Sequence, residues 1–386
     1  MFNRRDILTA VAATGVTALC PVRSFAETGV SADKIVFGQA AALDGPAAAL
    51  GTGMRDGILA AFAEANAAGG VQGRKFELVS VDDGYEPKRA IEATRTLLDQ
   101  GVFGLVGYVG TPTSMAVFPL VKSAKIPFIG AFTGTGGLRN PYQPLAVNVR
   151  ASYGQETEVM VERLVKDKGA KRFAILYQDD AYGAAGLAGT RRALDKRKMT
   201  LVAEAGYERN TVAVRVPLLE IRKAKPDAVI MIGAYRPCAE FIKVARSINF
   251  DPAFINISFV GSDALAKELG PAGAGVLVTQ VIPFPQDKSI PVVAAFHKAL
   301  KASKPDAVPG FVSLEGYVVG RTVVEGVRRV KGELTRDTLM AQLTNGTFDY
   351  GGFSLTYGPN NNQGSNAVYL TVIGADGKFK PATHIA

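Results

Sequence analysis

Histidine, cysteine and tryptophan are almost missing from this sequence. Its 386 residues contain two His, two Cys and no Trp. A disulfide-rich scaffold or a Cys/His zinc cage therefore lacks ligands, and general acid–base catalysis lacks its most common residue. The net charge of +9 is spread along the chain without a block of basic residues, which argues against a nucleic-acid-binding tail. We expect no catalytic residues, no metal and no cofactor.

The first 26 residues have the pattern of an export signal. Arg4-Arg5 precedes an apolar run from Ile7 to Leu19, and Ser24-Phe25-Ala26 offers small residues where a signal peptidase cuts. The arginine pair fits either a twin-arginine signal or the basic start of an ordinary secretory signal. We therefore predict that residues 1–26 are a signal peptide and that the mature protein is periplasmic.

The predicted mature chain has a net charge of +7 and one cysteine, Cys238, because the signal removes three arginines, one aspartate and Cys20. An exported chain with one cysteine has no internal disulfide, so its stability must come from a hydrophobic core. No later segment approaches 18 continuous apolar residues, which argues against a membrane span. The length favours two domains, and a hydrophobic content of 47% is too high for a disordered chain.

Strand and helix signals alternate from about residue 34 to residue 280, which predicts parallel sheets with helices on both faces. A first run ends near residue 129, and a second run of similar size begins near Ser152. The predicted strands are 34–42, 76–81, 103–109, 126–129, 172–177, 201–207, 228–232 and 253–257, with helices at 54–65, 87–98, 113–124, 183–198, 214–223 and 236–247.

The C-terminal tail has a different pattern. Helices are predicted over 290–302, 313–330 and 335–344, and strands over 352–357 and 367–373. A turn-rich segment, Gly358 to Gly364, joins the two strands. Because helices come first and a hairpin last, the tail can complete both earlier α/β units in turn, which requires more than one crossing between them.

Several short motifs follow one another in a specific order: EANAAGGVQGR at 64–74, DDGYEPK at 82–88, YQDDAYG at 177–183 and SLEGY at 313–317. Together they resemble the periplasmic branched-chain amino acid-binding proteins, the solute receptors of ABC importers. The resemblance implies an α/β protein of the type I periplasmic-binding fold, with two Rossmann-like lobes, parallel sheets and the ligand between the lobes. It also implies three hinge crossings, near 148–152, 280–286 and 346–352. The N-terminal lobe would comprise 27–148 plus 286–346, and the C-terminal lobe 149–285 plus 347–386.

Two loops at neighbouring strand ends have the composition of a small-anion site. Strand 103–109 is followed by Gly110-Thr111-Pro112-Thr113-Ser114, and strand 126–129 by the glycine- and threonine-rich loop 130–137. Ligands of open parallel sheets lie beyond the carboxyl ends of the strands, where backbone N–H groups and hydroxyls suit a carboxylate. Neither loop has a phosphate-loop lysine or the dinucleotide glycine spacing. Either loop alone is better explained as a plain turn or helix cap, but the two together at adjacent strand ends favour a small-anion site.

The resemblance assigns ligand contacts to particular residues. Thr111 matches a hydroxyl that holds the ligand carboxylate, and Phe132, Thr133 and Gly134 match a second contact loop. Tyr182 and Tyr235 match two tyrosines that close over the ligand from the second lobe, although an isolated tyrosine is more often an ordinary half-buried aromatic. The two tyrosines each follow a predicted strand end, which favours ligand contact.

Two positions depart from the family pattern. The disulfide of the best-known members would join positions held here by Tyr85 and Gly110, so we expect it to be absent. The acidic residue that pairs with an amino acid's ammonium aligns with Ser258, and a buried ammonium without an anionic partner is costly. Asp263 or Asp179 can still supply that charge from a shifted position. The preferred ligand is therefore an aromatic or other organic acid without an ammonium, and the alternative is an amino acid. Leu50 and the aromatic side chains would line its apolar body.

The sequence as a whole predicts a binding protein rather than an enzyme. Arg236 either adds charge to the pocket or faces solvent, Asp82-Asp83 lacks the spacing of a calcium loop, and Cys238 is expected to be a buried thiol. The expected partners are a small-molecule ligand and the membrane permease of an ABC importer, with no nucleic acid, and the expected oligomeric state is a monomer. The alternative function is a ligand-sensing receptor of the same fold that passes its signal to a membrane partner.

Overall fold

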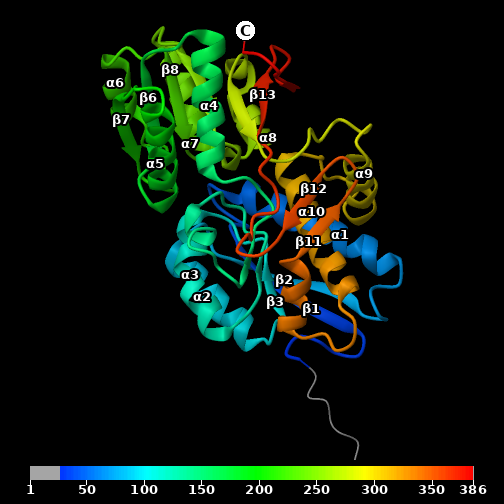
Figure 1. Ribbon diagram of the computed structural model, residues 1–386. Coiled ribbons are helices and arrows are strands. Elements are labelled where there is room, and N and C mark those ends of the chain that lie inside the picture. Colours follow the sequence, from blue (N-terminus) through cyan, green and yellow to red (C-terminus); the bar gives the residue numbers. More distant parts are fainter. Residues whose placement is uncertain (1–26, 386) are drawn as a thin grey trace, which may run out of the picture.

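The computed structural model describes residues 27–385, which form two α/β lobes (Figure 1). The predicted signal peptide, 1–26, lies outside the described residues. The first lobe contains a parallel five-stranded sheet in the order β2-β1-β3-β4-β5. Its strands are β1 (Lys34–Ala41), β2 (Lys75–Asp82), β3 (Gly104–Val106), β4 (Phe128–Ile129) and β5 (Ala146–Val147).

The second lobe contains a seven-stranded sheet in the order β14-β13-β10-β9-β8-β6-β7. The strands from the middle of the chain are parallel, and the last two, contributed by the tail, are antiparallel. The fold is therefore the predicted pair of parallel α/β lobes. The strands are β6 (Phe173–Gln178), β7 (Leu201–Tyr207), β8 (Ala228–Ile232), β9 (Ala253–Asn256), β10 (Leu277–Gln280), β13 (Tyr369–Ile373) and β14 (Phe379–Pro381).

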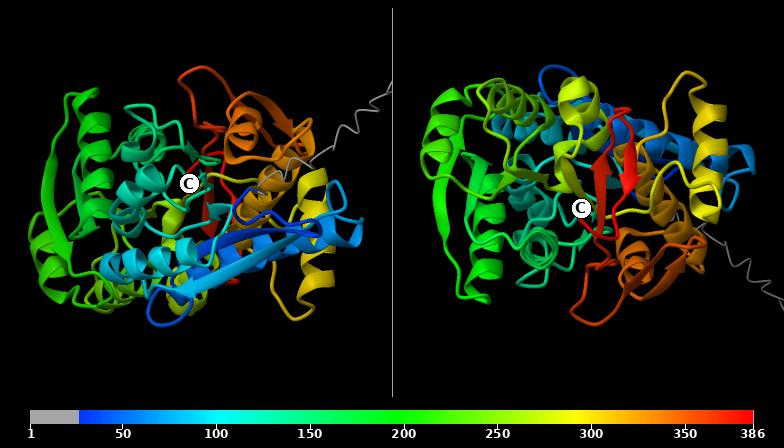
Figure 2. Two further views of the ribbon diagram at one scale, coloured as in Figure 1. Left: turned by 90° about the horizontal axis from the view of Figure 1, so that it is seen from below. Right: turned by 90° about the horizontal axis from the view of Figure 1, so that it is seen from above.

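Helices lie on both sides of each sheet, as the views from below and above show (Figure 2). In the first lobe they are α1 (Ala48–Ala67), α2 (Pro87–Asp99), α3 (Thr111–Ala124) and the 3-10 turn η1 (Gly136–Leu138). In the second lobe they are α4 (Tyr153–Lys168), α5 (Ala181–Asp195), α6 (Arg215–Lys223), α7 (Tyr235–Ser247) and α8 (Ser262–Leu269), with the 3-10 turns η2 (Ser258–Val260) and η3 (Gly270–Gly273).

After β10 the chain returns to the first lobe through α9 (Pro291–Ser303), α10 (Phe311–Arg329) and α11 (Arg336–Leu343). Helix α10 packs on α1 at very short range. A Cβ added to Gly57 would lie 2.0 Å from the Ser313 carbonyl oxygen, and one added to Gly316 would lie 2.3 Å from the Met54 carbonyl oxygen. Only glycine permits this backbone approach, so the two glycines fix the position of the first turns of α10.

The hairpin of β11 (Gly346–Asp349) and β12 (Ser354–Tyr357) rests on α10. The Arg329 guanidinium lies 3.7 Å from the centre of the Phe348 ring, and the hydroxyls of Thr322 and Tyr350 are 2.8 Å apart. The chain then passes beside the first crossing, where the Gly364 N–H donates to the Asn148 carbonyl at 2.7 Å. We therefore propose that the third crossing follows β12 rather than beginning at 346.

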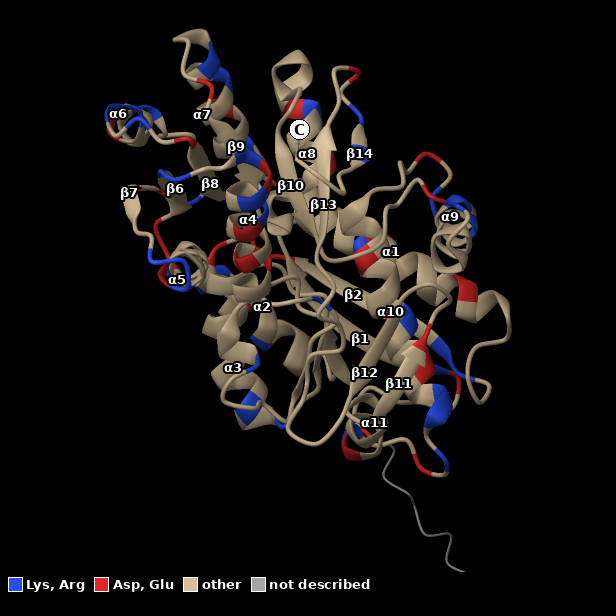
Figure 3. Ribbon diagram, turned by 45° about the horizontal axis from the view of Figure 1, so that its top comes forward, with Lys and Arg blue, Asp and Glu red and all other residues tan. Residues whose placement is uncertain are grey.

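Lysine and arginine are interspersed with aspartate and glutamate over both lobes (Figure 3). Within residues 27–385, the helices are all too short or too polar to cross a membrane. The hydrophobic interior fills the space between sheets and helices, and Cys238 lies in it as a free, buried thiol. Burial raises the pKa of that thiol well above its ordinary value, so Cys238 has the character of an inert core residue.

Candidate functional site

Thr111 and Thr133 face each other at adjacent strand ends of the first lobe. Their hydroxyl oxygens are 2.7 Å apart, and both side chains are buried. Gly134 packs against Tyr153, the first residue of α4, because a Cβ at Gly134 would lie 2.5 Å from a carbon of the tyrosine ring. Within residues 27–385 the buried hydroxyl of Ser114 has no hydrogen-bond partner, and the buried Tyr153 hydroxyl lies beside those of Thr111 and Thr133. This corner therefore offers polar groups that a ligand can satisfy.

Aromatic rings from both lobes meet beside these hydroxyls. The ring of Phe259, in η2, lies 5.2 Å from Phe132, 4.6 Å from Tyr182 and 6.0 Å from Tyr85, measured between ring centroids. Tyr182 also packs on Tyr153 at 5.3 Å. All five rings are buried. They form a wall of the kind that packs against an apolar or aromatic ligand body.

Tyr235 and Leu50 lie at one end of this cluster, from opposite lobes. Tyr235 opens α7 and is 4% exposed. A Cβ at Gly261 would lie 2.5 Å from Leu50 Cδ2 and 3.6 Å from a ring carbon of Tyr235. The lobe interface thus brings together the predicted contact residues of both lobes, while their role in ligand binding stays a prediction.

A buried cluster of charges, which the sequence did not indicate, lies beside the same residues. Arg150, at the first crossing, is 1% exposed and its guanidinium lies 4.6 Å from the centre of the Phe132 ring. Its Nη2 donates to the Ser258 hydroxyl and lies 3.6 Å from Glu156 Oε1. Its Nε lies 3.6 Å from Glu315 Oε1. Arg150 therefore stands between one carboxylate of the second lobe, on α4, and one of the first lobe, on α10.

The two carboxylates differ in how well they are bonded. Glu156 accepts hydrogen bonds from the Ser258 N–H and hydroxyl, both at 3.0 Å, and from the Thr279 hydroxyl at 2.6 Å. Among residues 27–385, Glu315 Oε1 finds no hydrogen-bond partner, and neither do Nε and Nη1 of Arg150. Hydrogen bonds thus hold Glu156 in place, whereas Arg150 and Glu315 retain unused bonding capacity.

The pKa values of Glu315 and Arg150 follow from this arrangement. Burial raises the pKa of Glu315 to about 7; Arg150 opposes that rise and the Glu156 charge adds to it. Burial alone would lower the pKa of Arg150, but Glu315 and Glu156 together raise it. Glu315 Oε1 is buried and accepts no hydrogen bond from residues 27–385 that would favour its charged form. Arg150 stays charged, and Glu315 titrates near neutral pH.

Two carboxylates that the sequence did not indicate lie near Ser258, the position at which the family pattern has an acid. The Ser258 side chain is hydrogen-bonded to Glu156, and a second carboxylate, Glu315, lies on the far side of Arg150. Neither of the two shifted acids takes that place, since Asp179 is exposed and Asp263 accepts from the Phe311 N–H at 2.8 Å. A preference for a ligand without an ammonium can therefore no longer rest on a missing acid. It has to rest on how Glu156 and Glu315 are hydrogen-bonded.

Polar contacts join the two lobes at the edges of the cluster. Arg209, after β7, contacts Glu86 of the first lobe at 2.7 Å and Asp180 of its own lobe at 3.0 Å. Asn210 donates to the Gly84 carbonyl at 3.1 Å, and the Tyr85 hydroxyl accepts from the Gln178 amide at 3.1 Å. The lobes are therefore in a closed arrangement.

Two hollows open between the lobes on either side of Leu50, at the end of the aromatic cluster. One, of about 410 Å³, is lined by Pro46 and Ala47 of the first lobe and by Asn210 and Val212 of the second. The other, of about 150 Å³, lies between Gly53 and Gly261. Arg236 lines the first hollow with a half-exposed side chain, 3.7 Å from Glu268, so it fits the solvent-facing explanation better than a role in the buried cluster.

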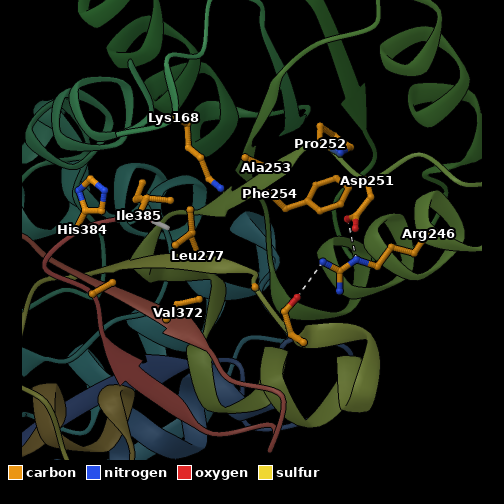
Figure 4. Close-up of a pocket in the computed structure, with 13 residues that line it drawn as sticks. Lys168, Arg246, Asp251, Pro252, Ala253, Phe254, Leu277, Val372, His384 and Ile385 are labelled. Carbon is orange, nitrogen blue, oxygen red and sulfur yellow. Dashed lines mark hydrogen bonds and ion pairs between the residues drawn. The ribbon is translucent and has the colours of Figure 1, made fainter. Parts of the chain in front are cut away.

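A third hollow, of about 420 Å³, lies in the second lobe, at the end of the sheet where β9 and β10 begin (Figure 4). It is lined by Ala253 and Leu277, where β9 and β10 begin, whereas ligands of parallel sheets lie where strands end. The Arg246 side chain beside it already donates to Asp251 at 2.9 Å and to the carbonyls of Ala272 and Ala274. Among residues 27–385, His, Cys, Asp and Glu form no group of three or more that would hold a metal ion.

Tyr85 and Gly110 lie side by side, as the positions of a lost disulfide should. A Cβ at Gly110 would lie 2.2 Å from Cε2 of Tyr85. The tyrosine ring thus fills the space beside the glycine, and its contact with Phe259 carries it into the lobe interface.

Comparisons with known proteins agree with this geometry. A family model described as "Periplasmic binding protein" matches residues 34–378. A solved structure titled a possible leucine/isoleucine/valine-binding protein from Rhodopirellula baltica is 41% identical, with a TM-score of 0.87 over 92% of this chain and 98% of that chain.

Curated relatives point the same way. The leucine-, isoleucine-, valine-, threonine- and alanine-binding protein of Pseudomonas aeruginosa is 25% identical over 86% of this chain and 88% of that protein. A Leu/Ile/Val-binding protein homolog of Brucella suis is 26% identical over 90% of this chain and 91% of that protein. These relatives are solute-binding proteins and not enzymes.

Proposed function

This chain belongs to the periplasmic binding protein family, and on that premise we propose that it is the solute-binding component of an ABC importer of the branched-chain amino acid type. Its relatives bind small molecules, and the lobe interface gathers hydroxyls, aromatic rings and a guanidinium in one buried place. A ligand that contacts both lobes stabilises the closed state and shifts its population. The closed form would then be presented to a membrane permease.

The ligand that we propose is a small carboxylate with an apolar or aromatic body, and the unused N–H groups of Arg150 carry this proposal. A buried guanidinium with free donors favours a bidentate carboxylate. We prefer an organic acid without an ammonium, because Glu156 is already occupied by three hydrogen bonds. An amino acid is the alternative, with Glu315 receiving its ammonium.

A thermal-shift screen of the mature chain tests this function. The panel contains amino acids, aromatic acids, short amides and dicarboxylates, each compared at the same concentration. A cognate carboxylate at 100 times its dissociation constant should add about 2.7 kcal/mol of stability. Stabilisation by amides together with no response to any carboxylate would contradict the proposed ligand class. Loss of uptake of the stabilising compound after deletion of the chain's gene would distinguish import from sensing.

The proposed location is the periplasm, where the relatives act, and the proposed oligomeric state is a monomer. Export through residues 1–26 is tested by sequencing the N-terminus of the protein recovered from a periplasmic fraction, with residue 27 expected first. Replacing Arg4 and Arg5 by lysine distinguishes the routes, because only twin-arginine export should fail.

A further inference from the structure

Arg150 and Glu315 form an ion pair in which each side chain has polar atoms without a hydrogen bond. Their closest atoms, Nε and Oε1, are 3.6 Å apart, beyond hydrogen-bond distance for such a pair. Both atoms are buried and unpartnered, as is Arg150 Nη1. Buried groups of this kind are normally hydrogen-bonded, so the pair has bonding capacity that its own side chains leave unused.

Neighbouring residues hold the Arg150 side chain in place, whereas another anion can take the place of Glu315 beside it. The Arg150 guanidinium is anchored by Ser258 and lies on the Phe132 ring. Its positive charge is already balanced by Glu156, which is itself held by the Ser258 N–H and the Thr279 hydroxyl. Glu315 is therefore the second anion beside Arg150, at the same distance as Glu156 but with fewer hydrogen bonds to hold it in place.

We propose that Arg150 binds the carboxylate of the ligand and that Glu315 is its resident counter-ion, which an anionic ligand displaces with uptake of one proton. This inference rests on the proposed function and deepens it by assigning the residue that selects the charge of the ligand. A monoanion takes the place of Glu315 beside Nε of Arg150, and the proton that neutralises Glu315 comes from solvent. A zwitterion instead needs Glu315 ionised, because the ammonium pairs with it.

The groups that act on Glu315 are few. Arg150 lies on the crossing, Glu156 on α4, and Arg139 follows η1. Asp263, on α8, lies at the start of α10, the helix that carries Glu315, and accepts a hydrogen bond from the Phe311 N–H. With the pKa of Glu315 raised to about 7 by burial, its protonation changes over the range in which both ligand classes can be tested.

The experiment measures binding of benzoate and of L-leucine to the mature chain by calorimetry at pH 6, 7 and 8. For the wild type, linkage predicts that benzoate affinity falls about tenfold from pH 6 to pH 8, whereas leucine affinity rises about tenfold. At pH 7, buffers of different ionisation enthalpy should reveal uptake of about half a proton with benzoate and release of about half with leucine.

Two variants separate this role from a structural one. Glu315→Gln removes the resident anion, so it should bind benzoate at pH 8 about tenfold more tightly than the wild type and lose the pH trend. A folding defect cannot mimic that gain. Arg150→Gln should lose benzoate binding. Asp83→Asn is the matched control, because Asp83 is also a buried carboxyl with a pKa raised to about 7, yet it should leave the pH trend unchanged.

Retention of the wild-type pH trend by Glu315→Gln would overturn the inference, and so would benzoate binding by Arg150→Gln at wild-type affinity. The absence of binding of both probes at 50 mM would also overturn it, since the inference requires only a carboxylate. A stabilising carboxylate in the thermal-shift panel would then leave the proposed function standing, which separates the two failures.

Discussion

Replacing Asp83 by asparagine should stabilise the protein at neutral pH and make its stability less dependent on pH. Asp83 follows β2 and is fully buried. Its Oδ1 accepts from the Tyr85 N–H at 2.8 Å, and Oδ2 has no partner. Burial raises its pKa to about 7, and the Tyr85 N–H only partly opposes that rise. Asparagine keeps an oxygen for Tyr85 and removes the charge.

The sign and size of the effect follow from linkage. The carboxyl binds its proton more tightly in the folded protein than in the unfolded chain, so its contribution is fully present below the unfolded pKa and is lost as pH rises towards 7. Each pH unit in that range costs about 1.4 kcal/mol. Between pH 5 and pH 7 the wild type should therefore lose about 2 kcal/mol relative to Asp83→Asn.

Urea unfolding of the wild type and the variant at pH 5, 6 and 7 measures this difference. The neighbouring Asp82 provides the control. Burial opposes ionisation of Asp82, but the N–H groups of Leu43, Gly84 and Asp44 outweigh it and lower its pKa. Asp82→Asn should therefore leave the change between pH 5 and pH 7 as in the wild type. A constant gap between the wild type and Asp83→Asn across this range would refute the reasoning.

Five further substitutions, two of them controls, test the packing, the binding site and the lobe interface. Gly134→Ala places a methyl 2.5 Å from the neighbouring tyrosine ring and should destabilise by about 1–3 kcal/mol in urea unfolding. Gly136→Ala meets nothing within 4 Å and should change stability by less than about 0.5 kcal/mol. Thr111→Val should weaken carboxylate binding about tenfold in calorimetry by removing one hydroxyl, and unchanged affinity would remove Thr111 from the site. Arg209→Gln should open the ligand-free protein in small-angle scattering, whereas Arg191→Gln, whose ion pair lies within one lobe, should not. Equal scattering from the two arginine variants would contradict the conclusion that Arg209 holds the two lobes together.

The layout of the fold could be predicted because strand and helix periodicity are local. The predicted strand over 201–207 coincides with β7, and the predicted helix over 113–124 lacks only the first two residues of the first turn of α3. That turn begins at Thr111, where a proline at the second position and a preceding glycine disguise the start. The predicted hairpin of 352–357 with 367–373 is wrong, since β12 pairs with β11 and β13 pairs with β10 of the second lobe. These pairings depend on tertiary contacts such as that of Arg329 with Phe348.

The polar half of the site was predicted in part. Thr111 and Thr133 could be found because both follow strands whose carboxyl ends share one sheet edge. Arg150, Glu156 and Glu315 could not, since burial of a charged side chain has no local signature and most such residues face solvent. A capping serine at Ser152 marks the start of α4, but nothing in that pattern shows that Glu156 turns inward.

A crystal structure of the mature chain with the carboxylate that stabilises it most in the thermal-shift panel tests the central claim most directly. We predict that the ligand lies enclosed between the lobes, with its apolar body against Tyr182 and Phe259 and its carboxylate about 3 Å from the guanidinium of Arg150. A ligand bound in the hollow beside Arg246 (Figure 4), or between the lobes with its carboxylate turned away from Arg150, would contradict the account.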